Sequence, residues 1–532
     1  MLFYLNLWEE EYLLTREHWI RAIHEKNWME AEYCQRQYQE QTQCFHDLHR
    51  QFSLLIGTAY GWERYRNEEQ PELKTLQKVW LKTLNQAWEI TKKGYLLIEE
   101  KKEKQPEQMT FQEVFIKSLY LRIREEVGTD PEVFHGYFQV LRYLEQQVDA
   151  RDRLLIYPQI TNRVLKLSYK IPLTGSEQKA ELQQLLDNCL EFLKIEGGFQ
   201  QLPELFEEKI KRWKEEYEGE LPPRLQKKTM EWKSMSEHIH WFYEEFQETY
   251  PQWSYSLFFN LDEVYCIHDV ISGRRKGYGW DWGELADDVC SEKEVERIEK
   301  KQVNPRMSTF QGLAKKLRFP SGNGTLVNQV GDPMLCHVMW EISRQTMLYA
   351  QKEILAEEHQ ERVWEALHMT MPKKDPAELK EWAFTRQEAM ILNMLAYSYD
   401  ELGQQEEGIA WMELLRAYYE KQPFAIEHYI DNYELVLHNL GNLYGNIGEY
   451  EKAMEAGRIA IRLALRTSRG DVLHRTLYDY GWNMEHLWEK DGCTKEKSRL
   501  CIEAALDFAR FYEIQKGVNH FERHLVEIYG ED

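Results

Sequence analysis

Residues Leu440–Ala453 read LGNLYGNIGEYEKA, and this stretch predicts a hairpin of two α-helices. Gly441 and Ala453 are small, as expected where two helices touch, and Tyr444 is large enough to fill the space between them. Gly448 is expected to end the first helix, because glycine readily adopts the left-handed conformation common at helix C-termini. The local pattern therefore favours a helical fold built from paired helices.

A second copy of this pattern lies at Leu395–Gly408, which reads LAYSYDELGQQEEG, and a looser third copy begins at Tyr480. The matched positions Ala396 and Gly441 are 45 residues apart (441 − 396). The spacing of small and aromatic residues resembles the tetratricopeptide repeat, whose unit is about 34 residues long. The extra length predicts longer helices or a longer linker around Pro423.

The rest of the chain also reads as helix, because apolar residues recur three and four positions apart. Fainter hairpins are expected at Trp19–Ala31 and across Ile156–Leu205. We expect a helical-repeat domain in the N-terminal half, and an irregular helical bundle remains the alternative.

Composition limits the class of protein. The chain has 532 residues, 43% hydrophobic and 30% charged, with a formal net charge of −23 (67 − 90). A chain this acidic cannot bind nucleic acid by bulk attraction, so any contact with DNA needs a local basic patch.

No apolar run approaches the roughly 18–20 residues that cross a bilayer, and the start does not resemble a secretory signal. The eight cysteines form no Cys-x-x-Cys pair. We expect a cytoplasmic protein with free thiols and no membrane partner.

Residues 264–319 differ in charge from the rest, with eleven Lys/Arg against nine Asp/Glu. The pattern predicts four short helices. The first ends after Arg274-Arg275-Lys276 and is closed by Gly277 or Gly279. The second is capped by Asp281. The third is capped by Ser291 and runs from Glu292 to Lys301, and the fourth is capped by Ser308 or Thr309 and runs to Leu317. The expected core of this small autonomous unit is Leu285, Ala286, Val289, Val295, Ile298, Leu313 and Leu317.

This stretch resembles the helix-turn-helix of the Cro and phage-repressor type. The resemblance rests on Val270–Lys276 for the end of helix 1, Asp281–Ala286 for helix 2, Ser291–Glu299 for helix 3 and Pro305–Thr309 for the following helix start. It implies that helix 3 lies in the major groove of DNA and that its early residues read base edges. The architecture, with helical repeats attached, is similar to that of Gram-positive peptide-sensing regulators, although those carry the module at the N-terminus.

The resemblance implies a set of DNA-contacting positions. Glu292, Lys293, Glu294 and Arg297 would face the groove, and Trp282 stands where the family often has a phosphate-holding glutamine. The candidates for backbone phosphates are Arg274, Arg275, Lys276, Lys300, Lys301 and Arg306. Glu294 and Glu296 replace the Thr and Ser expected on the reading face. A carboxylate can accept from cytosine N4, but acids facing a polyanion also repel it.

The repeats suggest a second binding face. In tetratricopeptide hairpins the first helix lines the groove at about four-residue steps. Those positions are Asn393, Tyr397, His438, Asn442, Asn446, Tyr478 and Trp482. Asparagine amides suit an extended peptide, since they both donate and accept. Packing between domains, or dimerisation through the same face, is the alternative.

Together these features predict an all-α protein in which helical-repeat arrays flank a central helix-turn-helix domain. The expected domains are an N-terminal helical-repeat domain (1–222), connecting helices (223–263), the helix-turn-helix (264–320) and a C-terminal tetratricopeptide-like domain (334–532). His46 and His49 share a helix face, but zinc needs three or four ligands, so no metal site, cofactor or enzymatic site is predicted.

The predicted function is a DNA-binding transcriptional regulator that acts on double-stranded DNA as a homodimer. A peptide or partner bound by the repeats would set the spacing of the paired reading helices. The alternative is a non-enzymatic scaffold or sensor for proteins or peptides that carries a degenerate helix-turn-helix.

Overall fold

The computed structural model is built of α-helices, as the sequence predicts. It describes residues 3–43, 68–83, 131–147, 150–171, 176–199, 201–217, 219–248, 264–319, 353–422, 430–467, 472–488 and 492–530, with a few single residues between these ranges. The predicted boundary at 320–333, the two histidines His46 and His49, and residues 423–429 of the linker near Pro423 lie outside the described residues.

The chain divides into two compact units that do not follow its linear order. Unit 1 contains residues 1–18, 259–463 and 475–498, and unit 2 contains residues 19–258, 464–474 and 499–532. The four domain ranges expected from the sequence remain a prediction.

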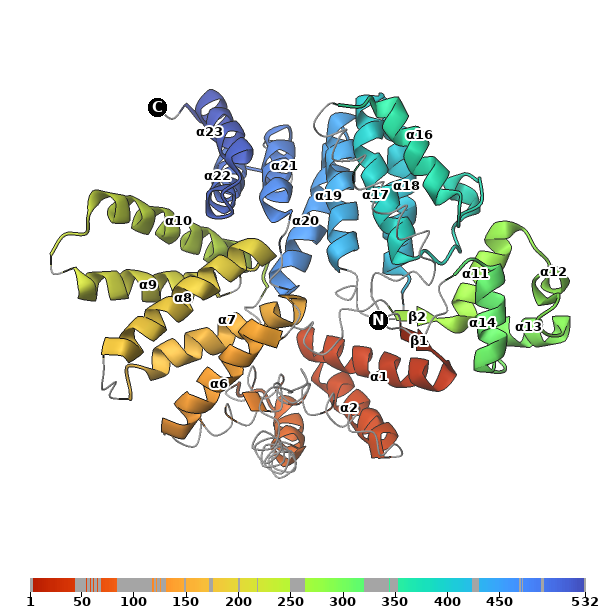
Figure 1. The fold of residues 1–532 in the computed structure, drawn as a ribbon, viewed down its shortest axis with the longest axis horizontal. Helices are drawn as coiled ribbons and strands as arrows, with labels where there is room; N and C mark the ends of the chain where they lie inside the picture. The colour runs from red at the N-terminus through yellow and green to blue at the C-terminus, as the bar shows by residue number, and fades with distance from the viewer. Residues whose placement is uncertain are drawn as a thin grey trace. The chain divides into compact units, whose positions relative to one another are not determined.

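Four short helices of unit 1, residues 264–319, form a group that we call the reading module after the role predicted from its sequence (Figure 1). They are α11 (Ile267–Tyr278), α12 (Trp282–Ala286), α13 (Glu292–Glu299) and α14 (Met307–Lys316). Strand β2 (Val264–Cys266) precedes α11 and pairs in parallel with β1 (Phe3–Leu5). This strand pair was not predicted, because neither three-residue segment has a period to detect.

The repeat helices of unit 1 pack in succession along the chain. They are α16 (Ala356–Leu367), α17 (Arg386–Glu401), α18 (Gln405–Glu420), α19 (Ile430–Asn446), α20 (Tyr450–Thr467) and α21 (Leu473–Glu485), with a 3₁₀ turn at Pro376–Glu378. Gly403 and Gly448 have φ of 69° and 81° and end α17 and α19, as their spacing predicts. The helices are 16 to 18 residues long in α17–α20. The expected extra length of the repeat is thus found partly in its helices.

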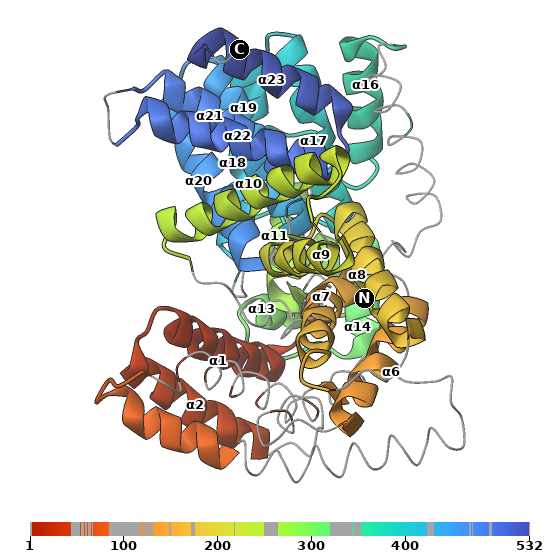
Figure 2. The same ribbon diagram turned by 90° about the vertical axis from the view of Figure 1, so that its left-hand side faces the viewer.

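Unit 2 is also made of helices, and each helix from α6 to α10 packs against the next one in the chain. Its elements include α2 (Trp28–Gln43), α6 (Pro131–Gln147), α7 (Ala150–Leu167), α8 (Ser176–Glu196), α9 (Leu202–Glu216), α10 (Pro223–Glu245) and α23 (Gln515–Tyr529). Most of α22 (Lys495–Phe511) also belongs to unit 2, whereas α1 (Leu7–His24) lies mostly in unit 1 and only its last residues belong to unit 2. Figure 2 shows α10 alongside α22. Their contact includes Asp507, which accepts from Ser234 Oγ at 2.6 Å and lies 3.0 Å from His238 Nδ1.

Within the described ranges, none of the helices combines the length and the apolar character that a membrane crossing requires.

Candidate nucleic-acid interface and repeat face

The reading module has the core that its sequence predicts. Leu285, Ala286, Val295, Ile298, Leu313 and Leu317 are all buried in one cluster, and Val289 packs against it half-buried. Val295 and Ile298 lie three apart on α13, so they turn one side of this helix into the core. The opposite side of α13 is left facing outward.

The helix ends of the module follow local capping rules, with one correction. Asp281 accepts from Glu284 N, and the Glu284 carboxylate accepts in return from Asp281 N, each at 2.7 Å. Ser291 Oγ accepts from Glu294 N at 3.2 Å and starts α13. The fourth helix is not capped by Ser308 or Thr309; it begins at Met307, and no side chain caps it. Pro305 before it favours an extended approach to the helix start.

The outward face of α13 carries exposed charges. Glu292, Lys293 and Arg297 are exposed, while Glu294 and Glu296 are half-buried. Among the described residues, no ion pair or side-chain hydrogen bond engages Lys293 or Arg297. These two side chains, four positions apart on one face, are the cations that α13 offers to a ligand.

Arg275 and Trp282 join the helices of the module instead of pointing to solvent. Arg275 holds the Glu299 carboxylate with two hydrogen bonds of 2.6 and 2.9 Å, and the indole nitrogen of Trp282 donates to the same carboxylate at 3.0 Å. The hydrogen bonds that Arg275 donates to Glu299 raise the pKa of Arg275. Lys300 lies over the Trp282 ring at 5.6 Å. The cluster fixes α11 and α12 against α13.

The prediction for Arg274 is wrong. It was predicted to contact a phosphate, but its side chain is completely buried. It donates to both oxygens of Glu388 at 3.0 and 3.1 Å and to the carbonyl oxygens of Leu317 and Ala383. Its guanidinium also lies 4.1 Å from the centre of the Trp382 ring. A phosphate cannot reach it in this structure, so Arg274 is a structural residue that joins α11 to the start of α17.

The remaining predicted phosphate contacts are exposed and differ in their partners. Lys276 pairs with Glu381 at 2.6 Å, Lys300 with Glu296 at 2.5 Å, and Lys301 with Glu10 at 3.1 Å. Arg306 is exposed, and no side-chain partner is found for it among the described residues. The pairs of Lys276 and Lys300 are exposed and therefore weak, so a phosphate can compete for these two lysines, whereas the carboxylate that pairs with Lys301 is buried.

The repeat-face positions do not all face outward. Asn393 and His438 are buried, Asn442, Tyr478 and Trp482 are half-buried, and Asn446 is exposed. The side chain of Tyr397 lies outside the described set. Asn393 instead accepts from Asn439 Nδ2 at 3.1 Å, which links α17 to α19. Asn446 donates to Asp400 and Asn442, and the Trp482 ring lies 4.4 Å from His486.

Sequence reasoning missed a half-buried carboxylate next to this face, Asp479, whose Oδ2 atom is shielded from solvent. Asp479 lies one turn before Asn483 on α21, and its Oδ2 is 3.3 Å from Nδ1 of the buried His438. Burial raises the pKa of Asp479 to about 7, with Arg475 partly opposing the shift. The buried Asn393 Nδ2 and Asn483 Oδ1 also lack hydrogen-bond partners among the described residues. The signal was present as polar residues at four-residue spacing on α21.

Comparison with known proteins supports the repeat assignment. Residues 436–464 match the tetratricopeptide repeat family, and this range covers most of α19 and most of α20. Among solved structures, the chain is similar to Bacillus thuringiensis PlcR in complex with the peptide PapR7 and DNA. That similarity has 20% identity and a TM-score of 0.25, and it covers 49% of this chain and 98% of PlcR. No curated protein matches the sequence.

Proposed function

We propose that this protein is a sequence-specific DNA-binding regulator of transcription. It acts as a cytoplasmic homodimer, and its repeats bind a peptide or a protein partner. The observation that carries the proposal is the outward face of α13, where Lys293 and Arg297 stand exposed while Val295 and Ile298 anchor the helix in the core. A short, capped helix held by its inner face and free on its outer face suits insertion into a major groove.

Charge supports this site over any other part of the chain. The reading module carries a net charge of +2 (11 − 9), on a chain of −23. Lys293 and Arg297 suit guanine edges or phosphates, and Glu292 suits the amino group of cytosine. Two modules of a dimer would read half-sites about 34 Å apart.

DNA binding is tested by selecting bound fragments from a random pool with the full-length protein. A two-fold symmetric sequence is the expected result. The double variant Lys293→Ala/Arg297→Ala should then lose at least about tenfold in affinity, since each contact to a base contributes roughly 1–3 kcal/mol. The affinity of the unaltered protein should fall steeply with salt.

The matched control is Arg224→Ala/Lys227→Ala, which removes two exposed cations three positions apart on α10. It should bind DNA like the parent protein. If both double variants bind equally, or if the pool yields no enriched sequence, α13 does not read DNA.

One observation favours the second candidate, a scaffold or sensor without DNA binding. Glu292, Glu294 and Glu296 share α13 with the two free cations, and Arg275, Lys276, Lys300 and Lys301 all pair with acids of this chain. A scaffold would show no salt-dependent shift with genomic DNA, yet it would enrich a peptide or protein in a pull-down.

Peptide binding by the repeats is supported by two accessible amide groups on α19. The exposed Asn446 and half-buried Asn442 present amides that can pair with an extended backbone. A displayed library of random peptides should be enriched by the parent protein and not by Asn442→Ala/Asn446→Ala. Asn519→Ala, an exposed asparagine on α23, is the control and should enrich the same peptides.

The two sites are joined by packing within unit 1. Arg274 of α11 bonds to Glu388 of α17, and α17 packs against α18 and α19. A ligand that shifts the repeat helices would therefore act on the module through Arg274. In this proposal the bound peptide should change DNA affinity, and DNA should change peptide affinity by the same factor.

A further inference from the structure

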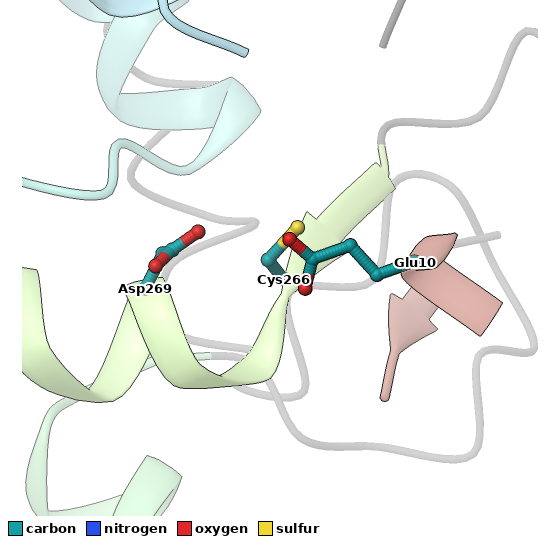
Figure 3. A group of neighbouring side chains, drawn as sticks. All are labelled: Glu10, Cys266 and Asp269. Carbon is teal, nitrogen blue, oxygen red and sulfur yellow. The ribbon is translucent and has the colours of Figure 1, made fainter. Parts of the chain in front are cut away.

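Three side chains from separate parts of the sequence meet beside the short strand pair of unit 1. The register Leu5↔Cys266 places the start of α1 next to the start of α11. Glu10 comes from α1, Cys266 ends β2, and Asp269 lies in the first turn of α11. One oxygen of each carboxylate and the sulfur of Cys266 lie within 4.8 Å of one another, as Figure 3 shows.

The cluster contains a polar atom without a partner. Glu10 is 9% exposed and Cys266 5% exposed, whereas Asp269 is open to solvent. The Glu10 carboxylate points toward the sulfur of Cys266 (Figure 3). Its Oε2 is buried and accepts no hydrogen bond within the part of the chain that the structure describes. Leaving a buried carboxylate oxygen unpaired is costly, so a cation bound to this oxygen would stabilise the arrangement.

The positive charge beside the two carboxylates comes from a lysine in this structure. Lys301, in the turn after α13, lies 3.1 Å from Glu10 Oε1 and 3.4 Å from Asp269. Its side chain is 39% exposed, so the ammonium group can move into solvent without crossing a packed layer.

We propose that Glu10, Cys266 and Asp269 form a binding site for a divalent transition-metal ion of the zinc class, which takes the place of the Lys301 ammonium group. One thiolate and two carboxylates are a ligand set that zinc accepts, with water in the fourth position. The thiolate disfavours magnesium and calcium, which prefer oxygen ligands. Zinc bonds of about 2.0–2.3 Å place tetrahedral donors roughly 3.5 Å apart. The distances between the three donor atoms must therefore shorten by about 1 Å when the ion binds.

Charge and atoms balance in this exchange. Before the metal binds, the two carboxylates and the Lys301 ammonium group carry a net charge of −1. On binding, the Cys266 thiol releases its proton to solvent, a sulfur–metal bond forms, and Lys301 leaves as an ammonium ion. The three anionic ligands and the divalent ion then also carry a net charge of −1. The ion would tie α1 to α11 and so fasten the N-terminal strand to the reading module.

The test uses cobalt(II) as the probe, titrated into the full-length protein purified without a metal-affinity tag. The expected result is a thiolate-to-cobalt charge-transfer absorption with one ion bound. Zinc, but not magnesium, should remove this absorption, and about one proton should be released per ion. Cys266→Ser should lose the absorption. Cys290→Ser, which alters a half-buried cysteine of the same module, should keep it.

The variant Lys301→Met distinguishes metal binding at this site from a general effect of mutation on folding, because it keeps all three proposed ligands. It should tighten cobalt binding at least about tenfold, equal to about 1.4 kcal/mol, by removing the competing cation. Glu10→Gln and Asp269→Asn should each weaken binding. The proposal fails if cobalt gives no thiolate absorption, if Cys266→Ser keeps it, or if Lys301→Met leaves the affinity unchanged.

Discussion

At the scale of single residues, Arg274 is held by more bonds than any exposed cation of the reading module. Its guanidinium meets the Glu388 carboxylate and the carbonyl oxygens of Leu317, Thr370 and Ala383. Removing one partner of a buried ion pair leaves an uncompensated charge, which costs far more than breaking an exposed pair.

Arg274→Met should therefore destabilise unit 1 by about 3–5 kcal/mol, because Glu388 stays buried without its cation. The measurement is the urea midpoint of unfolding, with hydrogen exchange of α11 and α17 to locate the loss. Lys276→Met, which breaks the exposed pair with Glu381, should cost less than about 1 kcal/mol. Equal costs for the two variants would show that the Arg274 pair is solvated.

Asp479 makes a second prediction at this scale, because burial raises its pKa to about 7. An unfolded aspartate ionises near pH 4, so the folded state holds its proton more tightly. Stability is then lost as pH rises from about 4 to about 7, and the full penalty remains above that range.

Asp479→Asn cannot ionise, so it should be more stable than the parent protein at about pH 8 and should lose that advantage near pH 4. Urea midpoints of both proteins across this range provide the measurement. A stability difference that stays constant with pH would mean that the pKa of Asp479 is not raised by folding.

At the scale of elements, close packing of helix α11 on the segment before α17 depends on glycine. A Cβ on Gly273 would overlap the carbonyl oxygen of Glu381, and one on Gly277 would overlap the Trp382 ring. Backbone atoms cannot swing aside as a side chain can, so the first clash must be relieved by moving the helix. Gly441 on α19 differs, since its Cβ would meet only Ala453 O at 3.5 Å, an ordinary contact.

Gly273→Ala should consequently destabilise unit 1 by about 1–3 kcal/mol, the usual cost of overpacking. Gly441→Ala is the control and should be neutral or stabilising by up to about 1 kcal/mol, because alanine favours a helix. Thermal unfolding of the two variants gives the comparison. If Gly273→Ala is as stable as Gly441→Ala, α11 does not press on the 379–384 segment in solution.

At the scale of the molecule, the reading module shares its core with the repeats. Ala383 belongs to the same buried cluster as Ile271 and Leu317, and Tyr278 packs on Trp382 with ring centres 5.3 Å apart. The sequence suggested an autonomous four-helix unit at 264–319, but the buried Arg274 obtains its carboxylate partner from residue 388.

A fragment of residues 264–319 should accordingly lose helix gradually on heating, without a cooperative transition. Circular dichroism and the dispersion of amide NMR signals measure this. A fragment with dispersed signals and a sharp melting transition would show that the module folds by itself. In such a fragment Arg274 would be solvated, and its replacement by Met would have little effect.

Local features of the sequence were sufficient to predict several parts of the fold. The caps at Asp281 and Ser291, the core of the module and the helix-ending glycines 403 and 448 all depend on residues within a few positions of one another. Interactions across one or two helical turns leave a periodic trace in the sequence, so these elements could be predicted without coordinates.

Contacts between distant residues could not be predicted in this way. Arg274 reads as one of three adjacent surface cations, and only the packing of Glu388, 114 positions away, makes it a buried structural group. Glu10 and Cys266 likewise meet through a strand pair that joins residues more than 250 positions apart. Helical periodicity identifies which side of an element is buried, but it carries no information on which distant element covers that side. Coordinates were therefore needed to separate the exposed cations from those that hold the protein together.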